Sequence, residues 1–212
     1  MSSAFFYGTL MHPKVLQRVI KHDGAQLHIC PAVLLVRIAT TLIVSKGTSL
    51  PVPFCTAPHT NTTTNAQRAE YPGMIPYDQT RVLCGRDLEP EERSVRGTLV
   101  TGLSARDMHL LDIFEGSEYI RKPVSVHPLA RAVALCDFSV DEMIPATPPP
   151  LPAPEELAPP VEAGTYVFVL PQRLEPALWS FEEFVLKNAH KWYGEQPPDE
   201  DVRWAELDAE GA

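Results

Sequence analysis

The stretch from Leu110 to Val126 constrains the fold most, because its pattern changes from helical to extended within a few residues. Apolar residues recur at helical spacing up to Phe114, and the pattern then alternates as in a strand. Between the two patterns lies Glu115-Gly116, a carboxylate followed by the residue whose backbone turns most freely. The pattern therefore indicates a chain of mixed short helices and strands.

Two interpretations of Glu115 are open on the residues alone. A carboxylate that is flanked by Ile113 and Phe114 and followed by glycine can be held in a partly apolar cleft. There its pKa would rise toward that of a useful general base. The alternative is a solvated residue at the end of a helix.

A second informative stretch, SAFFYGTL, lies at residues 3–10. It reads as a short apolar strand that runs into a glycine turn, and Pro13 then suits the first position of a helix. A strand, a glycine turn and a helix start can form a concave set of N–H groups that holds a carboxylate. A plain structural turn is the alternative.

Together these stretches resemble the gamma-glutamylcyclotransferase-like family, in particular its avirulence-induced-gene-like branch, which is known from plants, fungi and bacteria. The matching pieces occur in the family's order and are FFYGTL at 5–10, AEYPGMIPY at 69–77, VRGTLVTGLS at 95–104, LLDIFEGSEYIRKPVSV at 110–126, TYVFVL at 165–170 and WSFEEFV at 179–185. No single piece is diagnostic, but the ordered combination is fairly specific.

The resemblance implies an α+β fold, a small, mostly antiparallel, twisted β-barrel with helices packed outside. In that family the YGTL-type loop binds the amino-acid end of the substrate and the Glu of the EG pair is the base. The base corresponds to Glu115, and the loop to Tyr7, Gly8, Thr9 and Leu10. Tyr7 and Tyr119 are expected to wall the pocket, with Tyr119 offering a hydroxyl. Arg121 is expected either to pair with a substrate carboxylate or to form a salt bridge on the face of its strand.

The reaction that the resemblance implies is an acyl transfer of glutathione metabolism, catalysed by a cyclotransferase or lyase. The α-amine of a γ-glutamyl peptide or amine attacks its own γ-carbonyl, which gives 5-oxoproline and a free amine. The alternative is a non-catalytic protein on the same fold that binds a small molecule or uses a proline-rich arm to engage a partner. Retention of both YGTL and Glu115-Gly116 favours the enzyme, because a binding module has no need of the carboxylate.

Composition narrows the classes of function. With 212 residues the chain can bury one sizeable core, so one domain is expected. The formal net charge of −9 argues against a nucleic-acid partner, and no apolar run is long enough to span a membrane. The four cysteines, at positions 30, 55, 84 and 136, have no metal-site spacing, and the seven histidines are scattered. We therefore expect no metal or cofactor, and free thiols in the cytoplasm. The oligomeric state stays open.

The domain is expected to span residues 1–194, with irregular insertions at about 36–68 and 128–163 and an acidic tail at 195–212. The segment 36–68 is rich in threonine and nearly uncharged. It is either a true insertion or a gene-model error. Eight prolines fall between positions 145 and 160, which favours an extended, exposed arm. This arm suits either a ligand for a proline-binding domain or an inert linker.

Between the insertions, the pattern predicts helices over 13–22, from Ser104 and from Ser180, and strands over 27–35, 95–103 and 165–170. Pro31 suggests an edge strand or a bulge, and Gly97 a close approach of two backbones.

Overall fold

The computed structural model of the chain describes residues 1–35, 40–44, 71–87, 94–140, 144, 149–187 and 189–193. The acidic tail expected at 195–212 and most of the expected insertion at 36–68 lie outside these ranges.

The described residues form short helices and strands. The strands are β1 (Ser2–Phe6), β2 (His28–Leu35), β3 (Thr40–Val44), β4 (Pro72–Ile75), β5 (Ser94–Leu103), β6 (Tyr119–Pro128), β7 (Val133–Ala134), β8 (Val161–Phe168) and β9 (Leu174–Leu178). The α-helices are α1 (Pro13–Ile20), α2 (Tyr77–Cys84), α3 (Ala105–Glu115), α5 (Phe181–Lys187) and α6 (Ala189–Tyr193). Short 3₁₀ turns are η1 (Thr9–Met11), η3 (Gly116–Glu118), η4 (Leu135–Asp137), η5 (Pro154–Glu156) and η6 (Pro171–Arg173).

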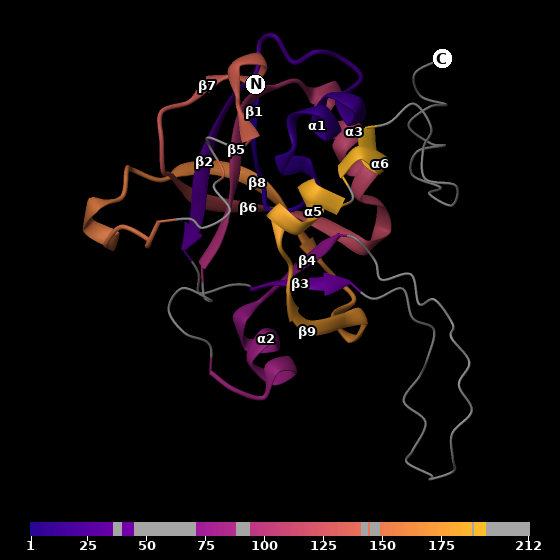
Figure 1. Cartoon of the computed structure of the whole chain (residues 1–212), viewed down its shortest axis with the longest axis vertical. Coiled ribbons are helices and arrows are strands. Elements are labelled where there is room, and N and C mark those ends of the chain that lie inside the picture. The colour runs from indigo at the N-terminus through magenta and orange to yellow at the C-terminus, as the bar shows by residue number, and fades with distance from the viewer. Residues whose placement is uncertain are drawn as a thin grey trace.

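Five of the strands close into a barrel. The order β5-β1-β8-β6-β2 returns to its start because β2 also pairs with β5, and β7 extends β2 at one end. Every pairing in this ring is antiparallel except that of β1 with β8. Helices lie outside the strands (Figure 1). The predicted α+β class, a mostly antiparallel barrel with external helices, is confirmed.

Alternate residues of the strands fill the barrel, as the period of an extended chain requires. Phe5 of β1 and Tyr7, which directly follows β1, pack in one buried cluster with Cys30, Ala32, Leu34, Leu99, Val126, Ala163 and Val167. Ala4 and Phe6, which face the other way, belong to the cluster beneath the helices. At Gly97 a Cβ would lie 2.1 Å from the carbonyl oxygen of Phe6, so only glycine lets β1 and β5 approach this closely.

The parallel seam between β1 and β8 is held mainly by side chains. The strands share a single paired position, Ala4 with Gly164. Beyond it, the Thr165 hydroxyl donates to the Phe5 carbonyl at 2.9 Å, and the Tyr7 hydroxyl donates to the Tyr166 carbonyl at 2.5 Å. Buried carbonyls without a strand partner would be costly, so these hydroxyls complete the closure of the barrel.

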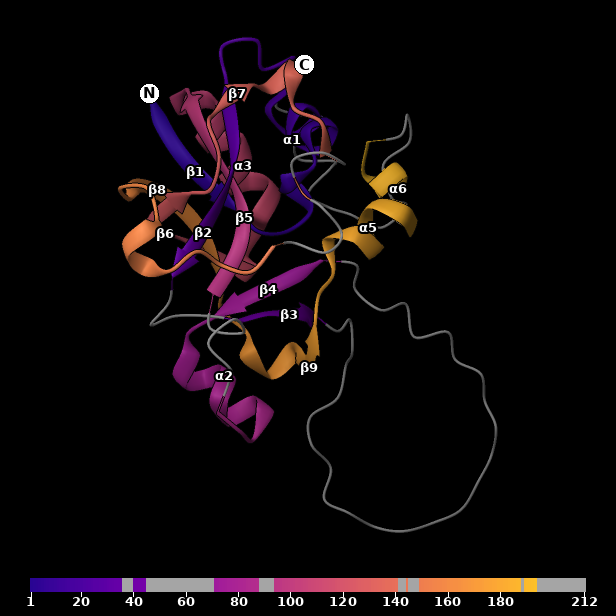
Figure 2. The ribbon, with the colours of Figure 1, turned by 60° about the vertical axis from the view of Figure 1, so that its left-hand side comes forward.

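The helices α1, α3 and α6 lie together against one side of the barrel (Figures 1 and 2). Pro13 occupies the first position of α1, as predicted, and the helix ends at Ile20. Val15, Leu16, Val19 and Ile20 form its buried face. No helix of the described residues is long and apolar enough to cross a membrane.

The helix α3 begins with a full capping box. Ser104 accepts from the N–H of Asp107, whose carboxylate accepts from the N–H of Ser104 at 2.7 Å and from His22 at 2.9 Å. Burial raises the pKa of Asp107, but the hydrogen bonds from Ser104 and His22 outweigh burial and lower the pKa overall. The helix that carries Glu115 is therefore fixed at its start.

A second, three-stranded sheet has the order β4-β3-β9. It differs from the sequence prediction in two ways. The strand β3 lies inside the segment 36–68, which we expected to be irregular, because its β-branched residues pair between β4 and β9. The strand β9 contains Pro176 and was not predicted, but an edge strand tolerates a proline.

The unpredicted helix α2 lies at the end of the molecule opposite α1 and α3 in both views (Figures 1 and 2).

The expectation that Pro31 marks an edge strand or a bulge is wrong. β2 has partners on both sides, with β5 along one side and β6 and β7 along the other. Pro31 lies where the second partner changes, between positions paired with β6 and positions paired with β7. A missing N–H is tolerated at that break, and the Pro31 carbonyl accepts from Leu129.

Candidate functional site

A cavity of about 410 Å³, which includes its open mouth, lies where β1 ends and α3 ends. Six predicted site residues line it: Tyr7, Gly8, Thr9, Leu10, Glu115 and Tyr119. They come from segments more than a hundred positions apart in the sequence. Tyr71, Tyr166 and Trp192 also line it and were not predicted as site residues.

The loop after β1 supplies backbone to the cavity. Gly8 precedes the 3₁₀ turn η1, in which Met11 donates to the Gly8 carbonyl at 2.9 Å. The first N–H groups of such a turn have no internal acceptor. Within the described ranges, the N–H groups of Thr9 and Leu10 donate to no other protein group. These N–H groups can therefore receive an anion.

Gly8 is required for space and not for a special backbone conformation. Its φ of −129° lies outside the left-handed region that favours glycine. A Cβ at this position would lie 2.7 Å from Cγ and 3.0 Å from Cδ of Pro72. Gly8 thus lets the loop pack directly against β4.

Glu115 is the last residue of α3 and is half-buried. The next residue, Gly116, has φ +62°, a conformation that favours glycine, so the sharp turn predicted after Glu115 is confirmed. Burial raises the pKa of both Tyr7 and Tyr166, and the negative charge of Glu115 adds to this rise. The Glu115 carboxylate therefore acts on both phenols across the cavity.

The hydroxyls of two lining tyrosines are used by backbone groups of β4. Tyr7 accepts from the N–H of Met74 at 3.3 Å, in addition to its bond to Tyr166. Tyr119 donates to the Pro72 carbonyl at 2.8 Å. Both rings line the cavity, and the Tyr119 hydroxyl already donates to the protein. These bonds hold β4 in place beside the cavity.

Arg121 does not line the cavity. Its Nε and Nη2 lie 3.1 Å from the two carboxylate oxygens of Asp112, one turn before Glu115 on α3. Of the two expectations for Arg121, the structure places it in the salt bridge. Asp112 also accepts from the Tyr166 hydroxyl at 2.8 Å. Tyr166 is thereby oriented beside Glu115 by a carboxylate whose charge Arg121 balances.

The other side of the cavity is aromatic. Tyr71 and Trp192 meet edge to face, with ring centroids 6.4 Å apart, and Phe114 meets Trp192 at 6.1 Å. Tyr71 donates to Glu118 at 3.1 Å, and Glu118 pairs with Arg173. The sequence does not predict this side of the cavity, because Tyr71, Phe114 and Trp192 lie in different elements and share no motif.

The arrangement suits proton transfer by a carboxylate. Within the described ranges, no three His, Cys, Asp or Glu side chains gather as a metal site. His12 caps α1 by accepting from Lys14, and burial, with the nearby Lys14 charge, lowers its pKa. Glu115 is the carboxylate among the lining residues, and backbone N–H groups of the same lining can stabilise an oxyanion.

No family model matches the chain, and no curated protein matches it. Solved structures do. One Arabidopsis thaliana protein is 20% identical, over 90% of this chain and 76% of that one, with a TM-score of 0.41. A second from the same plant is 16% identical, over 93% and 95%, with a TM-score of 0.42. A yeast gamma-glutamylcyclotransferase specific to glutathione is 13% identical, over 97% and 93%, with a TM-score of 0.43. Because these sequence identities and TM-scores are low, the assignment of the fold rests on the chain's own strand pairings.

Proposed function

We propose that the chain is a cofactor-independent cyclotransferase of the gamma-glutamylcyclotransferase-like family. It would act on a γ-glutamyl peptide or γ-glutamyl amine and release 5-oxoproline and a free amine. One observation carries the proposal: the loop from Tyr7 to Leu10 and the carboxylate of Glu115 line the same cavity. These are two of the motifs on which the sequence resemblance rests, and they are far apart in the chain.

The reaction balances without a co-reactant. The α-nitrogen forms a bond to the γ-carbonyl carbon, and the bond from that carbon to the leaving nitrogen breaks. The α-nitrogen starts as an ammonium and ends as the lactam N–H, so it loses two protons. The leaving nitrogen gains two and departs as an ammonium. Water is neither consumed nor produced.

In this proposal Glu115 takes a proton from the α-ammonium and returns one to the leaving nitrogen, while the second proton exchanges with solvent. Acid–base catalysis of this kind contributes about 10²–10⁴-fold. The N–H groups of Thr9 and Leu10 bind the α-carboxylate or the developing oxyanion. Because nucleophile and electrophile belong to one molecule, holding that molecule folded supplies much of the remaining acceleration.

Two further features support the proposal. Phe114 and the ring of Tyr7 give Glu115 a partly apolar surrounding, which strengthens its interaction with a bound ammonium. Cys30 and Cys136 are free thiols in the described part of the chain, in keeping with the cytoplasmic location proposed for the reaction.

The experiment is to incubate the purified chain with a panel of γ-glutamyl dipeptides, γ-glutamyl amines and glutathione, and to detect 5-oxoproline by mass spectrometry. Turnover of at least one compound, absent from a boiled control, is expected. No 5-oxoproline from any compound would contradict the proposal and favour the non-catalytic binding protein.

A further inference from the structure

We infer that Tyr71, Phe114 and Trp192 form a subsite for the leaving amine, and that this amine carries an aromatic or bulky aliphatic group. The inference rests on the proposed cyclotransferase function and names the class of substrate that the function would use. All three rings line the cavity that contains Glu115.

The three rings pack together in the wall of the cavity, and each residue is at most 8% exposed. Trp192 meets Tyr71 with the ring planes at 84° and Phe114 with the planes at 70°, both edge-to-face arrangements. Phe184 supports Trp192 from the core, with centroids 6.2 Å apart. A flat apolar group placed in the cavity would find rings already set in position.

The hydroxyl of Tyr71 holds its own ring in place. It donates to Glu118, which in turn is paired with Arg173. These side chains belong to the turn η3 after Glu115 and to η6 before β9. The Tyr71 ring is therefore oriented by a charge-assisted bond, and a preformed surface costs little ordering when a ligand binds.

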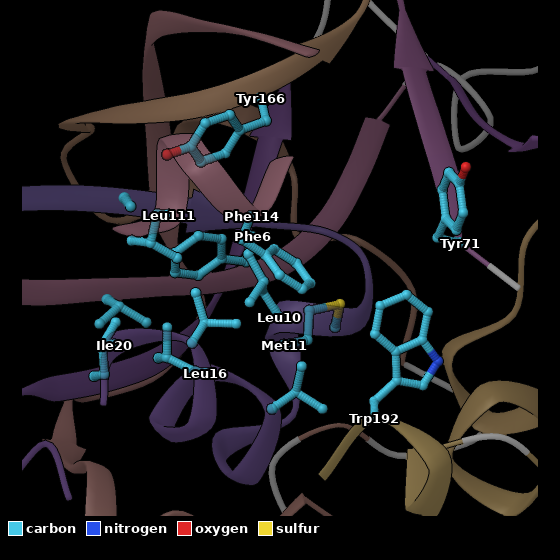
Figure 3. Close-up of a cluster of buried hydrophobic side chains, with 14 of the residues drawn as sticks. Phe6, Leu10, Met11, Leu16, Ile20, Tyr71, Leu111, Phe114, Tyr166 and Trp192 are labelled. Carbon is cyan, nitrogen blue, oxygen red and sulfur yellow. The ribbon is translucent and has the colours of Figure 1, made fainter. Parts of the chain in front are cut away.

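The position of the rings assigns them to the amine end of the substrate. Figure 3 shows Tyr71 and Trp192 together on one side of the cluster and Tyr166 on the other, with Phe6, Phe114 and Leu10 between. The Tyr166 hydroxyl donates to Asp112, one turn before Glu115 on α3, so the reacting carbonyl belongs near the Tyr166 side. The glutamyl part occupies the loop that begins at Tyr7, and the remaining group extends toward Trp192.

Charge favours a neutral group in this subsite. Among the described residues that line the cavity, Glu115 is the one with a charged side chain. The ion pair of Glu118 and Arg173 next to Tyr71 is neutral overall. A leaving group that ends in a carboxylate, as in a peptide, would add a second negative charge close to Glu115. An aromatic amine would instead bury its ring against Trp192 without that repulsion.

The test compares γ-glutamylbenzylamide, γ-glutamylmethylamide and glutathione as substrates of the wild-type chain. We expect kcat/KM for the benzylamide to exceed that for each of the others by at least ~10-fold, the range of small apolar differences in a pocket. Equal or lower kcat/KM for the benzylamide would overturn the subsite. Turnover of the methylamide or glutathione alone would leave the proposed function standing, whereas no turnover of any compound would remove both.

Two tryptophan variants locate the effect. Trp192→Leu is expected to reduce the benzylamide-to-methylamide ratio of kcat/KM at least ~5-fold, because the methylamide does not reach the ring. Trp179→Leu is the matched control, since Trp179 packs on Phe181 and Phe184 and does not line the cavity. Its ratio should stay at the wild-type value. An unchanged ratio in folded Trp192→Leu contradicts the inference, and Tyr71→Leu answers the same question if Trp192→Leu does not fold.

Discussion

Replacing Tyr7 by phenylalanine tests how the barrel is closed. The change removes a single hydroxyl from a side chain that is 7% exposed. That hydroxyl donates to the Tyr166 carbonyl in β8 and accepts from the Met74 N–H in β4. The variant leaves both backbone groups without this partner at the seam where β1 and β8 share one paired position.

The size of the effect follows from these two bonds. A hydrogen bond contributes about 1 kcal/mol, and a buried group left unsatisfied costs about 1–3 kcal/mol. Loss of both bonds should therefore lower the free energy of unfolding by about 2–4 kcal/mol. For a chain of this length that corresponds to a drop in Tm of roughly 5–15 °C.

Urea unfolding followed by tryptophan fluorescence measures the difference. Tyr77→Phe is the control, because the exposed Tyr77 hydroxyl donates to Asp87 across 3.4 Å and its loss should change stability by less than ~0.5 kcal/mol. If the two variants lose the same small amount, the hydroxyl does not hold the seam and the explanation of barrel closure is wrong.

Three further predictions concern other parts of the chain. Because the pKa of Asp107 is lowered on folding, its stabilising contribution is present above the unfolded pKa and lost as pH falls through the folded pKa. Asp107→Asn should thus lower the free energy of unfolding by about 1–3 kcal/mol at pH 7, and this difference from the wild type should disappear in acid. A difference that does not depend on pH would contradict this. Gly8→Val should lower kcat/KM at least ~10²-fold and Gly8→Ala less, because the new side chain meets Pro72; a Gly8→Val protein folded by circular dichroism with wild-type kcat/KM would place the pocket elsewhere. Replacing residues 149–160, which are mostly exposed, with a Gly/Ser linker should shift Tm by less than ~2 °C, and a large drop would show that this arm packs on the domain.

The barrel strands could be predicted because each carries a local signal. The alternation of residues 95–103 and the apolar run at 165–170 correspond to β5 and β8, and the Ser104 cap marks the start of α3. Closure into a barrel could not be read from such signals. It depends on which strands meet, and β1 and β8 are linked by one paired position and two side-chain hydroxyls.

The candidate site was predicted only where a motif marks it. The YGTL loop and Glu115-Gly116 are local patterns, and both line the cavity. Trp192 and Tyr166 have no such mark, because an aromatic residue on a short helix or a strand reads as core packing. Trp192 is in fact part of the core and of the cavity at once. The role of Arg121 was ambiguous because its contact with Asp112 depends on how β6 packs against α3, which the sequence does not show.

The central claim is that Glu115 is the general acid and base, and the most direct measurement is the rate of 5-oxoproline release by folded Glu115→Gln protein. The substitution keeps the shape of the side chain and removes its ability to carry a proton. On a confirmed substrate we predict a loss in kcat of at least ~10²–10⁴-fold, with Glu155→Gln, on the exposed arm, unchanged as the control. A Glu115→Gln protein that releases 5-oxoproline at close to the wild-type rate would contradict the account.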